Sequence, residues 1–316
     1  MNHKSRVLVT GGSGLVGQAI QKLVKERDEL AEKYEFLFLS SRDCNLGVES
    51  EVKKLFEQFK PDIVIHLAAQ VGGLYLNMRD PVNMLEKNLL INYHIIKFSH
   101  QFQVRQLIGC LSTCIFPNKI TYPITEEQLH EGPPHDSNFA YSYIKRMLEI
   151  QIRCYREQYG SNFSCVTPTN IYGPYDNCSL ENGHVIPGLI HQAYLSHQHH
   201  TPFYVRGTGK PRRQFLYSYD LARVFLELIG RTKLPDNIII SPTEEYSIGE
   251  VAEIIRQEFE IPELAYQKNY ADGQFKKTVS NSRLLTLLPG FKFTKLEDGL
   301  KETITWFRTH YPEVRM

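Results

Sequence analysis

Tyr141 and Lys145 are the two side chains of this sequence best suited to acid–base chemistry. They are four residues apart, and on a helix this spacing puts both on one face, about one turn apart. A tyrosine with an ordinary pKa near 10 exchanges protons poorly at neutral pH, and a nearby ammonium group favours its phenolate. The spacing also occurs by chance on many helices, and Tyr143 is a competing tyrosine, so the pair alone is weak evidence for catalysis.

A serine and a cysteine follow an apolar run at residues 106–111. If the backbone remains extended there, Ser112 and Cys114 point to the same side of the strand. Both side chains could then face a ligand at the edge of a sheet. Cys114 could equally be a small core residue, because free cysteines are often buried.

Two further features could bind an anion or move a proton. Lys210, Arg212 and Arg213 form a basic turn beside two glycines, which suits a diphosphate, although a solvated charged loop is the alternative. His184 is near the expected start of a helix, on a loop. A lone histidine is more often structural than catalytic, so its function stays open here.

The residues that most often bind metals do not form a metal site in this sequence. The six cysteines show no C-x-x-C pair, which indicates reduced thiols. A histidine cluster lacks suitably spaced acidic or thiol partners and is interpreted as a solvated helix end: His191, His197, His199 and His200. We therefore expect no metal.

A glycine-rich turn after the apolar run at 7–9 predicts dinucleotide binding. Gly12, Gly14 and Gly17 match G-x-G-x-x-G, in which the glycines allow a tight turn, close approach to a pyrophosphate and close helix packing. The N–H groups at the start of the next helix would face the phosphates. The alternative is a turn that merely needs glycine, but the strand before it and the helix after it favour the nucleotide.

The end of the second predicted strand favours NADP(H) over NAD(H). NAD-selective sites usually carry Asp or Glu there, whereas residues 40–43 read Ser-Ser-Arg-Asp. Arg42 could pair with a 2′-phosphate. An ordinary surface arginine remains the alternative.

The elements that must position these residues alternate along the chain. Short apolar runs at 34–39, 63–69, 106–111 and 162–167 predict strands, and apolar spacing at 15–30, 48–59 and 82–102 predicts helices. This alternation predicts an α/β fold with a Rossmann-type doubly wound parallel sheet. Residues 117–138 are long for a connector and predict a loop over a site.

The length of 316 residues suits one nucleotide-binding domain and a smaller lobe. We expect a Rossmann domain at 1–167, with about 214–237 returning to it. The remainder of 168–316 would form a discontinuous α+β substrate-binding lobe. That lobe would include the apolar run at 238–240, a helix at 248–259 and the segment 284–311.

Composition argues against several partners. Lys and Arg total 36 against 35 Asp and Glu, which gives no electrostatic footprint for nucleic acid or an anionic membrane. No apolar run approaches the length of a bilayer span, and the residues before the first apolar run form no signal h-region, so we expect no signal peptide. The expected location is cytoplasmic.

Taken together, the glycine loop, the HLAA strand, Ser112 with Cys114, Y-x-x-x-K and the run PTNIYGP resemble the extended short-chain dehydrogenase/reductases that act on nucleotide sugars. Within that superfamily, the segments CLSTCIFP, GPPHDSNFAYSYIKR, NGHVIPGLIH, GTGKPRRQF and DGQFKKT resemble the GDP-L-fucose synthases. The resemblance runs from Val7 nearly to the C-terminus.

The resemblance implies a bifunctional 3,5-epimerase/4-reductase that converts GDP-4-keto-6-deoxy-D-mannose to GDP-L-fucose with NADPH. Cys114 would be the base and His184 the acid, while Ser112 and Tyr141 would hydrogen-bond the enolate oxygen. Tyr141 would also protonate the oxygen at C4. Lys145 would bind the nicotinamide ribose and lower the pKa of Tyr141. A homodimer with a four-helix interface is also implied.

The family pattern further implies two sets of binding residues. The cofactor set is Gly11, Gly12, Ser13, Gly14, Leu15, Val16, Gly17, Arg42, Asp43, Leu67, Ala68, Ala69, Lys145, Pro168, Asn170, Ile171 and His184. The substrate set is Ser112, Gln192, Arg206, Arg213 and Asp272. Gln192 and Arg206 replace a lysine and a tryptophan common in the family, although arginine can stack on a base and glutamine can hydrogen-bond one.

Two alternatives remain at this point. The chain could be another NAD(P)-dependent nucleotide-sugar 4-epimerase or dehydratase, which would retain its cofactor without net consumption of NADPH. It could also be a non-catalytic NADP-sensing regulator, which would tolerate loss of the Tyr141–Lys145 pair.

Overall fold

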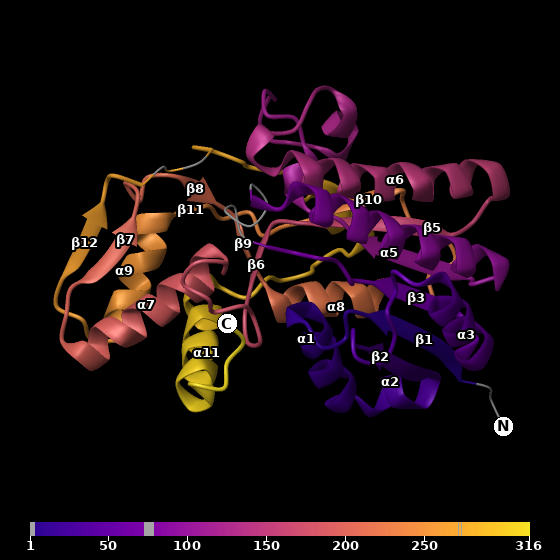
Figure 1. The fold of residues 1–316 in the computed structure, drawn as a ribbon, viewed down its shortest axis with the longest axis horizontal. Helices are drawn as coiled ribbons and strands as arrows, with labels where there is room; N and C mark the ends of the chain where they lie inside the picture. Colours follow the sequence, from indigo (N-terminus) through magenta and orange to yellow (C-terminus); the bar gives the residue numbers. More distant parts are fainter. Residues whose placement is uncertain (1–3, 73–78, 271, 273) are drawn as a thin grey trace.

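A six-stranded parallel sheet forms the centre of the computed structural model, which describes residues 4–72, 79–270, 272 and 274–316 (Figure 1). Its strand order is β10-β5-β4-β3-β1-β2, and every neighbouring pair is parallel. The strands are β1 (Ser5–Thr10), β2 (Tyr34–Leu39), β3 (Ile63–His66), β4 (Gln106–Cys110), β5 (Phe163–Pro168) and β10 (Asn237–Ile240). The predicted doubly wound parallel sheet is confirmed.

Helices cover both faces of the sheet. Along β1, Val7 and Val9 face one core and Leu8 faces the other, because successive strand residues point to opposite sides. The first core is covered by α1 (Leu15–Lys25), α8 (Ser218–Leu228) and α10 (Ser282–Leu287). The second is covered by α3 (Glu49–Phe59), α5 (Pro81–Gln101) and α6 (Phe139–Tyr159). The strands β3, β4 and β5 are therefore buried throughout.

A smaller lobe has its own hydrophobic core. It contains α7 (Val185–His199), α9 (Ile248–Glu258) and α11 (Leu296–His310), with β7 (Phe203–Arg206) paired to β12 (Leu264–Gln267). Short strand pairs connect it to the sheet: β6 (Asn170–Tyr172) with β9 (Phe215–Tyr217), and β8 (Arg212–Arg213) with β11 (Tyr246–Ser247). Among the described residues, no helix combines the length and the apolar character needed to span a bilayer.

The structure corrects the predicted placement of two C-terminal segments. Residues 238–240 belong to β10, which extends the main sheet beside β5, and not to the smaller lobe. Leu284 and Leu288 likewise pack in the first core of the sheet. The error has a physical reason: an apolar run predicts a buried strand, but only long-range pairing decides which sheet it joins.

Three predicted boundaries are also wrong. The helix expected over 15–30 is two helices, α1 and α2 (Asp28–Lys33), because Arg27 between them is extended. The strand expected over 63–69 ends at His66, and residues 67–70 follow without regular secondary structure. At residues 113–115 the chain forms a 3-10 turn, so strand alternation does not apply to Ser112 and Cys114.

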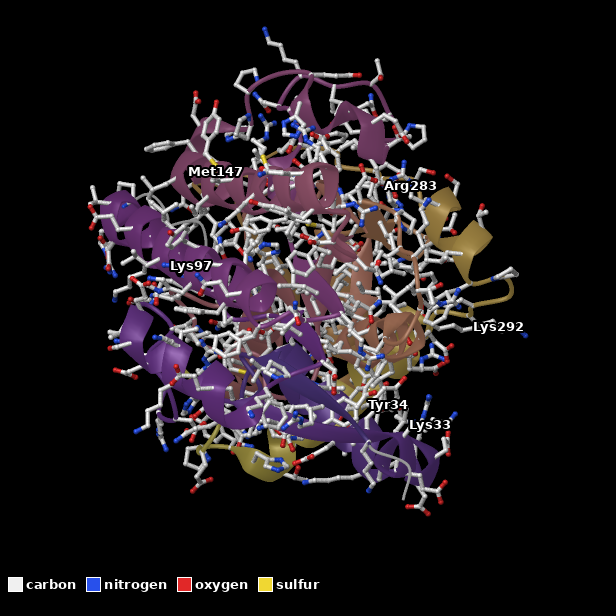
Figure 2. All side chains as sticks on the ribbon, turned by 90° about the vertical axis from the view of Figure 1, so that its right-hand side faces the viewer. Lys33, Tyr34, Lys97, Met147, Arg283 and Lys292 are labelled. Atoms are coloured by element: carbon white, nitrogen blue, oxygen red, sulfur yellow. The ribbon has the colours of Figure 1, made fainter. Side chains whose placement is uncertain are left out.

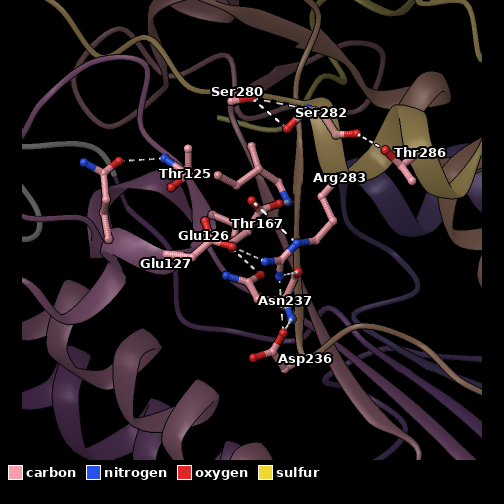
Figure 3. Close-up of polar contacts among 12 residues, drawn as sticks. Thr125, Glu126, Glu127, Thr167, Asp236, Asn237, Ser280, Ser282, Arg283 and Thr286 are labelled. Carbon is pink, nitrogen blue, oxygen red and sulfur yellow. Dashed lines mark hydrogen bonds and ion pairs between the residues drawn. The ribbon is translucent and has the colours of Figure 1, made fainter.

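The long loop 117–138 is fastened to the edge of the sheet by Arg283 of α10 (Figure 3). Its guanidinium donates to the Asn237 carbonyl at 2.8 Å and to the Glu127 carboxylate, and its Nε lies 3.8 Å from Glu126 Oε2. Glu126 Oε1 in turn accepts a hydrogen bond from the Ile239 N–H at 2.8 Å. The loop is thereby held against β10.

Candidate active site

The glycine loop fits a dinucleotide pyrophosphate. Gly11 has a φ of 70°, so the tight turn predicted for Gly12 is made one residue earlier. A Cβ on Gly17 would lie 2.4 Å from the Gly12 carbonyl oxygen, whereas one on Gly14 would meet only the Gly11 oxygen, at 3.3 Å. The backbone is therefore packed tightly at Gly17, whereas the space around Gly14 is more open. The first N–H groups of α1 can therefore receive a phosphate.

Arg42 and Asp43 follow β2, as predicted, and both are exposed. Asp43 accepts hydrogen bonds from the Ser40 N–H at 2.8 Å and the Ser40 hydroxyl at 2.6 Å, and these bonds lower its pKa. Its carboxylate thus organises the turn that presents Arg42. A cation that follows the second strand of a Rossmann-type sheet can pair with an adenosine 2′-phosphate.

A buried polar network that the sequence analysis missed holds the next cofactor segment. His66 Nδ1 lies 2.8 Å from Thr10 Oγ1, and Nε2 lies 3.1 Å from Asn92 Oδ1. Because Asn92 Oδ1 can only accept, the proton is assigned to His66 Nε2, and Nδ1 accepts from the Thr10 hydroxyl, whose oxygen also accepts from the Ala68 N–H at 3.2 Å. The network fixes Ala68 against the glycine loop.

The third predicted cofactor segment lies at the end of β5. Pro168 is buried, Ile171 packs on the first core, and Asn170 is exposed with its amide donating to the Gln214 carbonyl at 3.0 Å. These residues share the carboxyl edge of the parallel sheet with the glycine loop, which is where such folds bind ligands.

Ser112 and Cys114 are brought together by the 3-10 turn after β4. Ser112 Oγ accepts a hydrogen bond from the Cys114 N–H at 3.4 Å, and both side chains are only partly buried. Arg146 of α6 donates to the Ile115 carbonyl at 2.5 Å and fastens this turn to the helix that carries Tyr141. The partial exposure of Cys114 favours a site residue over a core residue.

Tyr141 and Lys145 share one face of α6, as the spacing predicted. Lys145 Nζ lies 5.8 Å from the centre of the Tyr141 ring and donates to the Cys110 carbonyl at 2.7 Å. Burial, followed by the nearby Cys114, raises the pKa of Tyr141 well above its ordinary value, and burial lowers that of Lys145. The predicted lowering of the tyrosine pKa is therefore not found in the protein alone, where Tyr141 is a neutral phenol.

Two cations lie at the junction with the smaller lobe. Arg213 donates to the carbonyl oxygens of Gln274 at 2.6 Å, Arg212 at 2.7 Å and Phe275 at 3.5 Å, which leaves two of its five N–H donors for a ligand. Lys277 was missed in the sequence. It interacts electrostatically with Cys114 and Arg213, and burial lowers its pKa.

The other predicted substrate residues lie on the smaller lobe. The guanidinium carbon of Arg206 lies over the Tyr270 ring, 5.1 Å from its centre. Gln192 is partly buried on α7. Asp272 accepts two hydrogen bonds of 2.7 Å from the Thr208 N–H and hydroxyl, which lower its pKa. Asp272 therefore shapes the turn after β7.

His184 occupies the N-cap position of α7, near a helix start as expected, and its side chain makes no capping hydrogen bond. Its Nδ1 lies 3.7 Å from Asp176 Oδ1, and this carboxylate raises the pKa of His184. In the described part of the chain, no hydrogen bond or ion pair joins His184 to Ser112, Cys114, Tyr141 or Lys145. The candidate catalytic residues therefore fall into two groups, with His184 and Asp176 in one and the four residues of the sheet domain in the other.

Comparison with known proteins identifies this arrangement. Residues 7–247 match the model of the NAD dependent epimerase/dehydratase family. The chain is 46% identical to a GDP-L-fucose synthase of Dictyostelium discoideum, covering 99% of this chain and 98% of that protein. It is 40% identical to a probable GDP-L-fucose synthase of Drosophila melanogaster, covering 98% and 99%.

A solved structure agrees with these relatives. The GDP-L-fucose synthetase of Naegleria fowleri bound to NADP superposes with a TM-score of 0.93 at 42% identity, covering 100% of this chain and 98% of that one. The resemblance predicted from the motifs is confirmed. The chain therefore belongs to the NAD dependent epimerase/dehydratase family and, within it, to the GDP-L-fucose synthases.

Proposed function

We propose that this protein converts GDP-4-keto-6-deoxy-D-mannose to GDP-L-fucose with NADPH, as a 3,5-epimerase and 4-reductase. The proposal is carried by one observation: the turn with Ser112 and Cys114, which follows β4, is hydrogen-bonded to α6, the helix that carries Tyr141 and Lys145. This edge of the sheet also carries the glycine loop. Family membership and the NADP-bound Naegleria relative support the substrate and the cofactor.

Epimerisation uses the acidity of the protons beside the 4-keto group. Cys114 removes the proton from C3 or C5, and the electron pair moves toward the oxygen at C4. Ser112 and the neutral Tyr141 phenol donate hydrogen bonds to that oxygen. His184 then protonates the same carbon on the opposite face, so the configuration inverts without net loss of a proton.

Reduction uses the protonated tyrosine. The glycine loop, Arg42 and Lys145 would hold NADPH, which would supply a hydride for C4 when bound. Burial keeps the proton on Tyr141, which is the form required to protonate the C4 oxygen. The remaining N–H donors of Arg213 and the ammonium of Lys277 would bind the diphosphate.

Deuterium exchange separates the two steps. In D₂O without reduced cofactor, the wild type should incorporate deuterium at C3 and C5, and Cys114→Ala should lose most of this exchange because alanine cannot accept a proton. Tyr141→Phe should retain exchange while NADPH oxidation falls roughly 10²–10⁴-fold. The exposed Cys154 provides the control Cys154→Ala, which should keep both activities.

NMR analysis of the product tests the function itself. Formation of GDP-L-fucose with stoichiometric NADPH oxidation is expected. Turnover without NADPH consumption would instead identify another 4-epimerase or a dehydratase, and NADPH binding without any turnover would identify a sensor.

We also propose a homodimer. The adjacent helices α5 and α6 expose apolar side chains that a second copy would cover: Val82, Leu85, Leu89, Leu90 and Tyr93 on α5, with Phe139, Tyr143 and Met147 on α6. Two such pairs would form the four-helix interface implied by the family. A cytoplasmic location remains a prediction.

A further inference from the structure

Asp176 is a buried carboxylate that the predicted site does not include. Its side chain is 7% exposed, and its Oδ1 accepts a hydrogen bond from the Asn177 N–H at 2.8 Å. Within the described residues, its Oδ2 is buried without a hydrogen-bond partner. A buried acceptor of this kind is costly unless a charged or donor group faces it, so Asp176 requires a partner.

His184 is the charged group that pairs with this carboxylate, on the side of Oδ1. Its Nδ1 lies 3.7 Å from Asp176 Oδ1, which is an ion-pair distance, and the histidine side chain is 50% exposed. Pairing through Nδ1 leaves Nε2 for proton transfer. The exposed edge of the ring allows solvent to return a proton after each transfer.

The other charges around His184 oppose its protonated form. His184 lies at the N-cap position of α7, where the helix dipole disfavours a cation. The Arg315 guanidinium lowers the pKa of His184, whereas Asp176 has the larger, opposite effect and raises it. Cys178 adds no charge, because burial raises its pKa to about 12.

We propose that Asp176 is the positioning residue of His184, which orients the ring through Nδ1 and holds it in the charged form while Nε2 delivers protons to C3 and C5. This inference rests on the acid role proposed above for His184. In each step the imidazolium loses one proton to the substrate carbon, and the electron pair of the enolate forms the new C–H bond. The Asp176 carboxylate stays ionised throughout.

An NMR titration of the full-length protein tests the pairing independently of activity. With ¹³C-labelled histidine, and the His184 signal assigned from His184→Gln, the wild-type His184 should titrate above 6.5. Asp176→Asn removes the charge with little change in shape and should lower this pKa by on the order of one unit. Arg315→Gln is the opposite control and should raise it.

The pH profile of deuterium exchange tests the catalytic consequence. At a pH above the His184 pKa of both proteins, Asp176→Asn should exchange about tenfold more slowly than the wild type. The reason is that the protonated fraction of His184 falls tenfold when its pKa falls by one unit. Below both pKa values the two proteins should exchange at similar rates, because His184 is then protonated in each. NADPH affinity and thermal stability of the variant show whether the fold is retained.

Two results would overturn the proposal. The first is a wild-type His184 that titrates below 6.5, a result that does not depend on whether Asp176→Asn folds. The second is an unchanged His184 pKa in Asp176→Asn. A wild type that makes no GDP-L-fucose would instead refute the proposed function, and the NMR titration would still decide the pairing.

Discussion

Arg42 is the residue that should select the cofactor. Its guanidinium is exposed at the end of β2, on a turn held by Asp43 and Ser40. Arg42→Ala should reduce kcat/KM for NADPH on the order of 10- to 100-fold, because a charge-assisted contact to the 2′-phosphate is lost. The kcat/KM for NADH should barely change.

A matched control is available at the opposite end of the same strand. Lys33 is an exposed cation directly before β2 (Figure 2), and Lys33→Ala should leave both cofactors unaffected. Equal use of NADPH and NADH by the wild type would contradict the prediction.

His66 should make stability depend on pH. Burial, followed by the nearby Lys145 ammonium, lowers the pKa of His66 to about 4, against 6.5 in an unfolded chain. Between these values the unfolded state binds more protons, so the free energy of unfolding decreases as the pH falls from 6.5 toward 4. The full contribution is about 3 kcal/mol.

Urea denaturation of the wild type and His66→Gln from pH 7 to pH 4.5 would measure this effect. The variant should be less stable at pH 7, because Thr10 and Asn92 lose a buried partner. The difference between the two proteins should shrink as the pH falls. A difference that stays constant over this range would show that His66 is not a buried neutral histidine.

At the scale of elements, Arg283 is one of the residues that fasten the loop 117–138 to the sheet. Arg283 bonds the Asn237 carbonyl and the carboxylate of Glu127 and faces Glu126 (Figure 3). Arg283→Ala should lower the free energy of unfolding by about 1–3 kcal/mol, because Glu126 would remain buried without its cation. Hydrogen exchange at residues 124–131 should accelerate.

The control for this prediction is Arg105, whose side chain is 63% exposed and whose Nε lies 3.7 Å from Asp62 Oδ1. Arg105→Ala should have little effect, because exposed ion pairs contribute little to stability. Equal exchange in the loop for both variants would mean that other contacts, such as the bridge between Ile124 and Val279, hold it.

The sequence predicted the parts of the site that depend on local geometry. Helical spacing sets Tyr141 against Lys145, and the glycine loop lies between a strand and a helix. For Ser112 and Cys114 the sequence predicted the residues correctly but not the backbone conformation, because a 3-10 turn replaces the expected extended strand. Short-range patterns do not encode such a turn.

Contacts between distant segments could not be predicted in this way. Lys277 approaches Cys114 from the far end of the chain. The sheet membership of β10 depends on the same kind of long-range pairing. Asp176 and His184 are close in sequence, but the irregular loop between them has no pattern that predicts their contact. A hydrophilic residue inside an apolar strand, as at His66, was the one signal of a buried network available in the sequence.

At the scale of the molecule, the chain passes between the lobes several times, and the candidate site draws on both. The sheet domain supplies Cys114, Tyr141 and Lys145, and the smaller lobe supplies His184. The helix α6 contributes to this site with one face, and its exposed residues Tyr143 and Met147 lie on another. Figure 2 shows α6 and α5 side by side, marked by Met147 and Lys97. A dimer through these helices would therefore support the helix that carries Tyr141.

Sedimentation velocity tests this assembly. The wild type should sediment at twice the 36.6 kDa of one chain, and Leu89→Glu with Met147→Glu should shift it toward the monomer, because each change puts a charge into an apolar interface. Leu285→Glu is the matched control, since Leu285 is a comparably exposed leucine on α10. Because Tyr141 shares α6 with Met147, the monomeric variant should also lose NADPH oxidation more than NADPH binding. A wild-type monomer, or a dimer that survives both glutamates, would show that the apolar face of α5 and α6 is not the interface.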